Sequence, residues 1–399
     1  EVSRMAGMSF EDYVNAYYRG GLDISARYGI KKDDLTTGDT AYFNTMYGAS
    51  VFNQLNTKSD IFKLFRKEGW TQSGWRVMHK RSAAASNIGV TEGAGFGTSD
   101  VPDLKQISAD IKEIVSPYTV STRAAILAEA DDGVKGLAAF LRAQAAEAHS
   151  FYIDQMLVAK VGTPAGDNME SLQRIVADND LAGLTAVAAT DVDIYTTIDR
   201  SETGAAASNE DGWANAYVDH GVISSNETAR DLSLSQLDTM IQNAIENGAV
   251  YSDLILLTGY QQLTEIKQLI TAGTSNATWR MALESQAPKG TNGVQSEPGM
   301  NLDARVGYYD SIPIYASQHI DATIMDNQVA TGGTKTLMGP VFLLDMSNLY
   351  MKVAAPTTFL AQEDLANVQA LKRNYAFMTA GEIICTKFKT QGILRGLEF

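Results

Sequence analysis

The most constraining feature of this sequence is a run of helical periodicity between Gly133 and Lys160. Apolar residues recur along it at spacings of three and four, which is one stripe of an α-helix. The stripe consists of Val134, Leu137, Leu141, Ala145, Ala148, Tyr152 and Met156. No proline interrupts it, and Gly162 follows it at a position where a helix can end. At about 1.5 Å per residue the run predicts a rod of roughly 40 Å.

A helix of this length has two interpretations. The ordinary one is a long core helix of a large α/β protein, and the other is a spine helix along which the rest of a subunit is arranged. For the spine helix we expect the apolar stripe to pack on a sheet of the same chain. The polar side, with Arg142, Glu147 and Asp154, is then expected to face away from that sheet.

Composition limits the class of protein. The 399 residues suggest two or three domains, and a hydrophobic content of 45% is that of a folded chain. No apolar run reaches the length of a membrane span, and the first residues lack the pattern of a secretory signal. The net charge of −15 argues against a protein whose main task is to grip nucleic-acid phosphates.

The sequence offers no catalytic, cofactor or metal site. Four histidines are scattered over unrelated segments, and no HxxxH, CxxC or serine-elbow pattern occurs. The glycines at 93, 95 and 97 lack the strand and helix of a dinucleotide loop. A calcium loop around Asp211 fails because its first and last ligand positions are Ala207 and Val218. The single cysteine, Cys385, lies in an apolar run and is predicted to be a buried thiol.

Two regions lack the apolar pattern of a compact core. Residues 71–112 have strand-like ends around a glycine-rich middle, which predicts a long two-stranded loop that needs a partner surface. Residues 163–232 are polar and predict a surface insertion. The basic cluster Arg76, His79, Lys80 and Arg81 can meet phosphate or the acidic groups of a neighbouring subunit.

Elsewhere the patterns alternate between strands and helices, as in an α/β layer domain. The helix predicted over 233–247 opens with a Ser233–Gln236 capping box. The other predicted elements are a short helix at 59–67, strands at 111–121 and 253–258, a helix at 260–270, and strands at 305–316, 339–344, 350–359, 375–379, 383–388 and the C-terminus.

In this order the pieces resemble the HK97-fold major capsid proteins of tailed double-stranded DNA viruses. The stretch from Glu92-Gly93 through Pro102 to Thr122-Arg123 resembles the extended E-loop of the family and its exit toward the spine helix. DLILLTGYQQLTEIKQLI and YYDSIPIYAS resemble parts of the axial domain, although the usual glycine is replaced at 309–311. MGPVFLLDMSNLYMKVAA and the C-terminal segment from Asn367 resemble the closing strands.

The resemblance implies an α+β capsid fold with five parts. These are an N-terminal arm (1–70), an extended β-hairpin E-loop (71–112), a peripheral domain with the long spine helix (113–165), an α/β axial domain (166–310) carrying the polar insertion, and closing strands (311–399). The residues expected to act in assembly are Arg76, Lys80, Arg81, Glu92, Gly93, Phe96 and Pro102 in the E-loop and Leu137, Leu141, Tyr152 and Met156 in the spine helix.

The function implied by the resemblance is structural rather than enzymatic, without cofactor or metal. The subunit is expected to form pentamers and hexamers of an icosahedral shell around double-stranded DNA, without sequence-specific binding and without a membrane. Implied partners are its own copies and scaffold, portal and decoration proteins, with assembly in the host cytoplasm and a final place in the virion. Family members are often trimmed by a maturation protease, so cleavage just before Glu1 is expected.

Two other classes remain open at this stage. An encapsulin-like nanocompartment shell would share the fold and hold a cargo enzyme, although such proteins usually lack the N-terminal processing and the large axial insertion. A tail or adhesion module would fit the polar insertion but not the spine helix with the loop before it.

Overall fold

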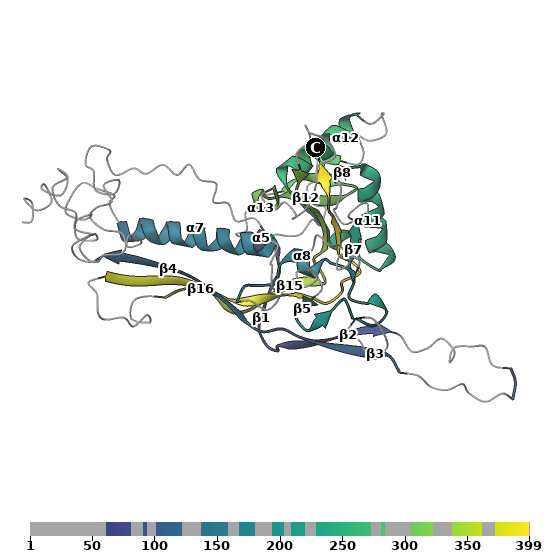
Figure 1. The fold of residues 1–399 in the computed structure, drawn as a ribbon, viewed down its shortest axis with the longest axis horizontal. Coiled ribbons are helices and arrows are strands. Elements are labelled where there is room, and N and C mark those ends of the chain that lie inside the picture. The colour runs from purple at the N-terminus through teal and green to yellow at the C-terminus, as the bar shows by residue number, and fades with distance from the viewer. Residues whose placement is uncertain are drawn as a thin grey trace, which may run out of the picture. The chain divides into compact units, whose positions relative to one another are not determined.

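The structure is a computed structural model that describes residues 61–80, 91–93, 101–121, 137–158, 167–179, 194–202, 209–219, 229–272, 281–283, 305–321, 337–360 and 372–398 (Figure 1). The expected arm lies almost wholly outside these residues. The chain divides into two compact units. The first unit comprises Glu1–Lys58, Val115–Phe151 and Ala355–Thr379, and the second comprises Ser59–Ile114, Tyr152–Ala354 and Ala380–Phe399.

A seven-stranded mixed sheet forms the centre of the second unit. Its strand order is β10-β11-β12-β9-β14-β17-β7. The strands are β7 (Tyr217–Asp219), β9 (Leu254–Thr258), β10 (Met281–Leu283), β11 (Arg305–Tyr309), β12 (Ile312–Ala316), β14 (Val341–Asp345) and β17 (Gly392–Leu394). The central strand β9 is parallel to β12 and antiparallel to β14. All residues of β9, β12 and β14 are buried, which predicts cover on both faces of the sheet.

Alternating side chains of these strands enter two different cores. Leu254 and Leu256 of β9 join one cluster, whereas Ile255 and Leu257 join the other, as the two-residue period of a strand requires. The first cluster includes side chains of α11 (Leu234–Glu246) and α12 (Tyr260–Ala272). Both helices therefore cover the same face of the sheet (Figure 1).

The opposite face is covered by residues that the sequence assigned to a surface insertion. That expectation is wrong for the described part of 163–232. Met169 and the whole of α8 (Leu172–Ile175) are buried, as are Tyr195, Trp213 and Ala214. All except the polar members of α8 belong to the second core cluster. The sequence does not reveal that these residues belong to the core. Many polar residues separate them, and the apolar residues follow no helical or strand period.

Helix α11 begins as its sequence predicts. Ser233 Oγ accepts a hydrogen bond from the Gln236 backbone N–H, and the Gln236 side chain accepts one from the Ser233 N–H. This capping box satisfies two N–H groups that the helix itself cannot bond. Leu237, Met240, Ile241 and Ala244 form the buried stripe.

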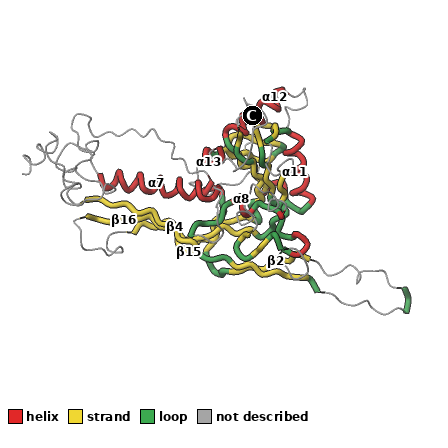
Figure 2. Tube along the Cα trace, viewed as in Figure 1, coloured by secondary structure: helices red, strands yellow, loops and turns green. Residues whose placement is uncertain are grey.

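The long helix is α7 (Leu137–Val158), and it ends in the second unit. Within the first unit it runs beside β4 (Lys112–Ser121) and β16 (Lys372–Cys385) (Figure 2). His149 links the three elements there: its Nδ1 lies 2.8 Å from Ser116 Oγ, and its Nε2 lies 2.8 Å from Thr379 Oγ1. Burial lowers the pKa of this imidazole, so at neutral pH it serves as an uncharged hydrogen-bonding group.

The buried side of α7 is offset by one residue from the predicted stripe. Tyr152 is 56% exposed, whereas Ile153 and Leu157 are fully buried. Asp154, expected to face away, is also fully buried, and its carboxylate accepts hydrogen bonds from the backbone N–H groups of Ile61 and Phe62. The helix is rich in alanine, so several of its sides look apolar, and a polar side chain with buried partners cannot be recognised from periodicity.

The segments predicted as two strands at 375–379 and 383–388 are one long strand, β16, which ends at Cys385. It lies between β4 and β15 in a four-stranded sheet of order β1-β15-β16-β4. The other elements are α5 (Ile61–Leu64), β1 (Lys67–Gly69), β2 (Gly74–Lys80), β3 (Asp103–Ser108), β5 (Ile194–Tyr195), β6 (Ile198–Asp199), η3 (Glu210–Gly212), β8 (Arg230–Asp231), η4 (Tyr251–Asp253), α13 (Gln318–Asp321), β13 (Leu337–Met338), β15 (Leu349–Leu360) and β18 (Leu397–Glu398).

Among the described helices, none combines the length and the apolar character that a membrane crossing requires.

Candidate assembly surface

The predicted two-stranded loop has a regular antiparallel base formed by β2 and β3. Trp75 pairs with Ile107, Val77 with Lys105, and Met78 with Leu104. The register shifts between Met78 and Lys80, which is a bulge of the kind that changes the direction of a side chain. The two strands are labelled in Figure 1.

One face of this hairpin packs on the second unit's own core. Ile107 is fully buried, and Trp75 and Val77 pack against the same core cluster. The Trp75 ring meets Tyr195 edge-on with 6.5 Å between ring centroids. These contacts fix the base of the hairpin, since isolated two-stranded ribbons are marginal in water.

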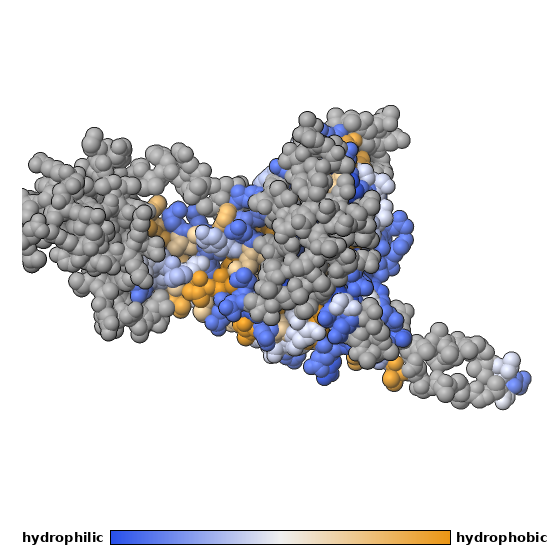
Figure 3. All heavy atoms as spheres, viewed as in Figure 1, coloured by the Kyte–Doolittle hydropathy of each residue, from blue (hydrophilic) through white to orange (hydrophobic). Residues whose placement is uncertain are grey.

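The other face and the end of the strands carry exposed apolar side chains. Met78 and Leu104, which are cross-strand partners, are 57% and 55% exposed, and Val101 is 76% exposed. Figure 3 shows hydrophobic surface at the end of the described hairpin strands. We call Met78, Val101 and Leu104 the apolar tip. Apolar surface concentrated on a projecting ribbon is typical of a protein–protein contact.

The charged residues at the base of the hairpin pair within the same chain. Lys105 Nζ lies 3.3 Å from Glu210 Oε2, and Lys80 Nζ lies 3.8 Å from Asp211 Oδ2. The Lys80 pair is mostly exposed and contributes little to stability. The basic cluster was predicted to meet phosphate or the acidic groups of a neighbour. Here Lys80 of that cluster and the neighbouring Lys105 form ion pairs with acidic groups of η3 of the same unit.

The sequence-predicted assembly residues are only partly brought together. Arg76 and Lys80 lie on β2 and are exposed, and Pro102 is exposed immediately before β3. Glu92 and Gly93 lie in an exposed turn, where Gly93 has a φ of +87° that favours glycine. Arg81 and Phe96 lie outside the described residues.

The residues predicted for the spine helix are placed in α7 as follows. Leu141 and Met156 are half-buried, Tyr152 is exposed, and the backbone alone is described at Leu137.

A buried polar cluster in the second unit was not predicted from the sequence. Glu382 Oε1 accepts hydrogen bonds from the backbone N–H groups of Glu170 and Ile383, and Glu170 forms a 2.7 Å ion pair with Arg174. Burial and the neighbouring Glu170 carboxylate raise the pKa of Glu382 to about 8. Burial also raises the pKa of Glu170, which Arg174 partly offsets. No spacing in the sequence links positions 170 and 382.

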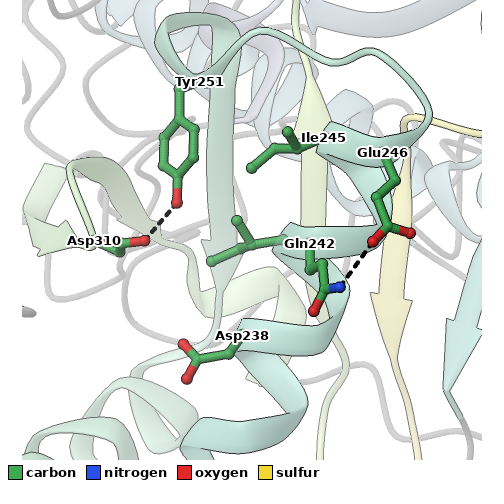
Figure 4. A pocket seen from close by; sticks show the side chains of 7 residues that line it. Asp238, Gln242, Ile245, Glu246, Tyr251 and Asp310 are labelled. Atoms are coloured by element: carbon green, nitrogen blue, oxygen red, sulfur yellow. Dashed lines mark hydrogen bonds between the residues drawn. The ribbon is translucent and has the colours of Figure 1, made fainter.

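A second polar site lines a small cavity of about 330 Å³ between α11 and the turn after β11 (Figure 4). Tyr251 donates a hydrogen bond to Asp310, and Gln242 donates one to Glu246 at 2.8 Å. Burial, together with the bond to Asp310, raises the pKa of Tyr251 to about 12. The carboxylates of Asp238, Glu246 and Asp310 make this an acidic surface cavity, and none of the predicted assembly residues lines it.

The fold is similar to solved capsid structures over more than four-fifths of the chain. The cyanophage A-1(L) capsid asymmetric unit aligns with a TM-score of 0.58 at 13% sequence identity, covering 88% of this chain and 95% of that chain. The capsid of the native GTA particle aligns with a TM-score of 0.51 at 11% identity, covering 86% and 92%. The chain has a phage capsid fold. By sequence, no family model and no curated protein matches it.

This capsid fold confirms the mixed helix-and-strand capsid architecture that the resemblance implied. The interpretation of α7 as the spine helix and of the β2–β3 hairpin as the base of an E-loop stays a prediction, as do the five domain boundaries. At 13% identity or less, backbone geometry is retained while sequence comparison fails to detect the relationship.

Proposed function

We propose that this chain is the major capsid protein of a tailed double-stranded DNA virus. In this proposal, copies of the chain form hexamers and pentamers that close into an icosahedral shell around packaged DNA. The observation that carries the proposal is the likeness to two capsid structures along more than nine-tenths of their length. A match of that extent involves the whole subunit and not a domain shared by unrelated proteins.

Two features of the chain support a container role. The hairpin presents an apolar tip while its base is anchored in the subunit core, as a contact arm requires. The net charge of −15 keeps enclosed DNA from adhering to the wall. Shell subunits repeat such contacts around closed symmetry, so individually weak contacts sum to a stable particle.

The proposal includes partners and a place of action. The subunit contacts its own copies, and scaffold, portal and decoration proteins complete the particle. Assembly takes place in the host cytoplasm, and the protein ends in the virion capsid. Its role there is structural rather than catalytic.

Sedimentation of the purified full-length chain tests the proposal. We expect particles that sediment far faster than a single chain, and we expect native particles to protect double-stranded DNA from nuclease. A chain that remains monomeric under all assembly conditions would contradict the shell role. Closed particles that carry a protein cargo and no DNA would contradict the viral role.

A further inference from the structure

Three potential metal ligands converge on the inner face of the β2–β3 hairpin, at the same end of the two strands as the apolar tip. They are His79 from the end of β2, Asp103 from the start of β3, and Glu210 from η3. One ligand atom from each lies within 4.8 Å of the other two, and all three residues belong to the second unit. Residues 79 and 210 are 131 positions apart in the sequence, so the fold alone creates this group.

The buried imidazole of His79 has a ring nitrogen that no described residue satisfies with a hydrogen bond. Its side chain is 1% exposed, and its Nε2 lies 3.2 Å from Asp103 Oδ2. That approach does not satisfy hydrogen-bond geometry, and Nε2 has no hydrogen-bond partner among the described residues. A buried polar nitrogen without a partner is costly. His79 Nε2 and Asp103 Oδ2 are therefore close to each other without forming a hydrogen bond, as two ligands of one metal ion are.

The distances and the atom types fit a divalent transition-metal ion. Ligand atoms bound to one tetrahedral Zn²⁺ at about 2.1 Å lie roughly 3.4 Å from each other. The His79–Asp103 separation of 3.2 Å is close to this value, and the Glu210 ligand atom lies within 4.8 Å of the other two. Imidazole nitrogen favours zinc and its neighbours in the first transition row over calcium and magnesium, which prefer oxygen ligands.

We propose that His79, Asp103 and Glu210 form a zinc site that joins the two hairpin strands to the η3 segment. A fourth position stays open to water, as in zinc sites with three protein ligands. The ion would neutralise the two carboxylates and give Nε2 its missing partner. It would thereby hold this end of the hairpin strands on the core. This site is independent of the proposed shell function.

A substitution of Lys105 distinguishes a zinc site from a group of residues held together only by ion pairs. Its ammonium lies 3.3 Å from Glu210 Oε2 and repels a divalent cation at the same carboxylate. Lys105→Met is therefore expected to tighten zinc binding. If only ion pairs hold these residues together, the same substitution would loosen the contact between the hairpin and η3 and would not tighten zinc binding.

The experiment is a calorimetric Zn²⁺ titration of the full-length chain after treatment with a chelator. We expect one zinc per chain, a higher melting temperature with zinc, and slower hydrogen exchange in β2 and β3. His79→Gln, Asp103→Asn and Glu210→Gln should each weaken binding at least tenfold, since loss of an outer-shell partner alone costs about 10–100-fold. The control Asp110→Asn changes an exposed carboxylate two residues beyond β3 and should bind like the wild type.

Two results would overturn the proposal: a wild-type chain that binds no zinc, or zinc binding that all three substitutions leave unchanged. Loss of binding in the three variants, with retention in Asp110→Asn and tightening in Lys105→Met, would support it.

Discussion

Arg200 shows how one buried cation organises the segment that covers the second face of the large sheet. Its side chain is fully buried. Its guanidinium donates to the carbonyl oxygens of Ala214, Arg174 and Ile175 at 2.8 to 3.0 Å. Burial lowers the pKa of Arg200 to about 10, which leaves it charged near pH 7. Because the guanidinium fork fits three acceptors at once, lysine cannot replace it.

Replacing Arg200 should therefore be severely destabilising. In Arg200→Met the three carbonyls lose their donor inside the core, and each unsatisfied buried group costs about 1–3 kcal/mol. We expect a loss on the order of 3–5 kcal/mol in urea unfolding followed by tryptophan fluorescence. The control Arg76→Met removes an exposed arginine and should change stability by less than about 0.5 kcal/mol. A loss below about 1 kcal/mol for Arg200→Met would contradict this role.

Glu382 should make stability depend on pH. Its pKa is about 8 in the folded chain and about 4.3 when unfolded. Between these values the unfolded state has released a proton that the folded state keeps, so stability falls as pH rises. Glu382→Gln imitates the protonated form, and we expect it to be more stable than the wild type by about 2 kcal/mol or more at pH 8.

The advantage of Glu382→Gln should shrink as pH falls toward 5, where the folded wild type keeps its proton at little cost. Thermal melting at pH 5, 6.5 and 8 measures this trend. The control Glu113→Gln alters an exposed carboxyl and should show no such trend. If the extra stability of Glu382→Gln is constant with pH, or largest at pH 5, the pKa of Glu382 is not raised in the folded chain.

Among the elements, the tight turn between β11 and β12 stores strain. Tyr309 pairs with Ile312 across two intervening residues. Those residues, Asp310 and Ser311, have φ values of 46° and 68°. Both lie in the left-handed region, as in a type I′ hairpin turn. Asparagine followed by glycine is the preferred pair there, so this chain accepts a strained serine.

Ser311→Gly should relieve that strain. The expected gain is about 1 kcal/mol, because left-handed backbone costs a non-glycine residue roughly 1–2 kcal/mol and added chain entropy takes back part of it. A rise in melting temperature is the measurement. Ser235→Gly, in the first turn of α11, is the matched control and should lower stability by a few tenths of a kcal/mol. An unchanged or lower melting temperature for Ser311→Gly would show that the turn is not strained at Ser311.

The elements with strong local signals could be predicted from the sequence. The capping box of α11, the apolar strand β9 and the hairpin arms each carry their own pattern, and the structure confirms them. The long helix was also predicted, but its buried side was not, because alanines make several sides apolar. The turn at 310–311 was noted only as a departure from the usual glycine.

The polar part of the core and the site on the inner face of the hairpin could not be predicted. The Glu170–Glu382 and His79–Glu210 pairs join segments far apart in the chain, and only the tertiary fold brings them together. The described parts of 167–216 carry isolated apolar residues without periodicity, so no local sequence pattern predicts their packing on the large sheet. A single sequence without comparison to relatives does not contain that information.

At the scale of the whole molecule, the proposed shell depends on contacts between copies, and the apolar tip of the hairpin is the described surface on which such a contact can be tested. Leu104→Glu places a charge on the apolar tip, where the side chain is 55% exposed. We expect the subunit to fold normally, with a change of less than about 0.5 kcal/mol in unfolding free energy. We also expect loss of particles in sedimentation, because a desolvated charge at a contact is costly.

Leu104→Met is the matched control, since it keeps an apolar side chain of similar volume. It should assemble like the wild type. Normal particles from Leu104→Glu would show that the apolar tip is not a contact between copies, whatever the function of the shell.

Electron microscopy of the purified chain tests whether it is a shell subunit. The proposed shell function predicts closed icosahedral shells built from hexamers and pentamers, in which the chain can be traced with the fold described above. Single subunits, open fibres or amorphous aggregates under conditions in which the chain is folded would contradict it.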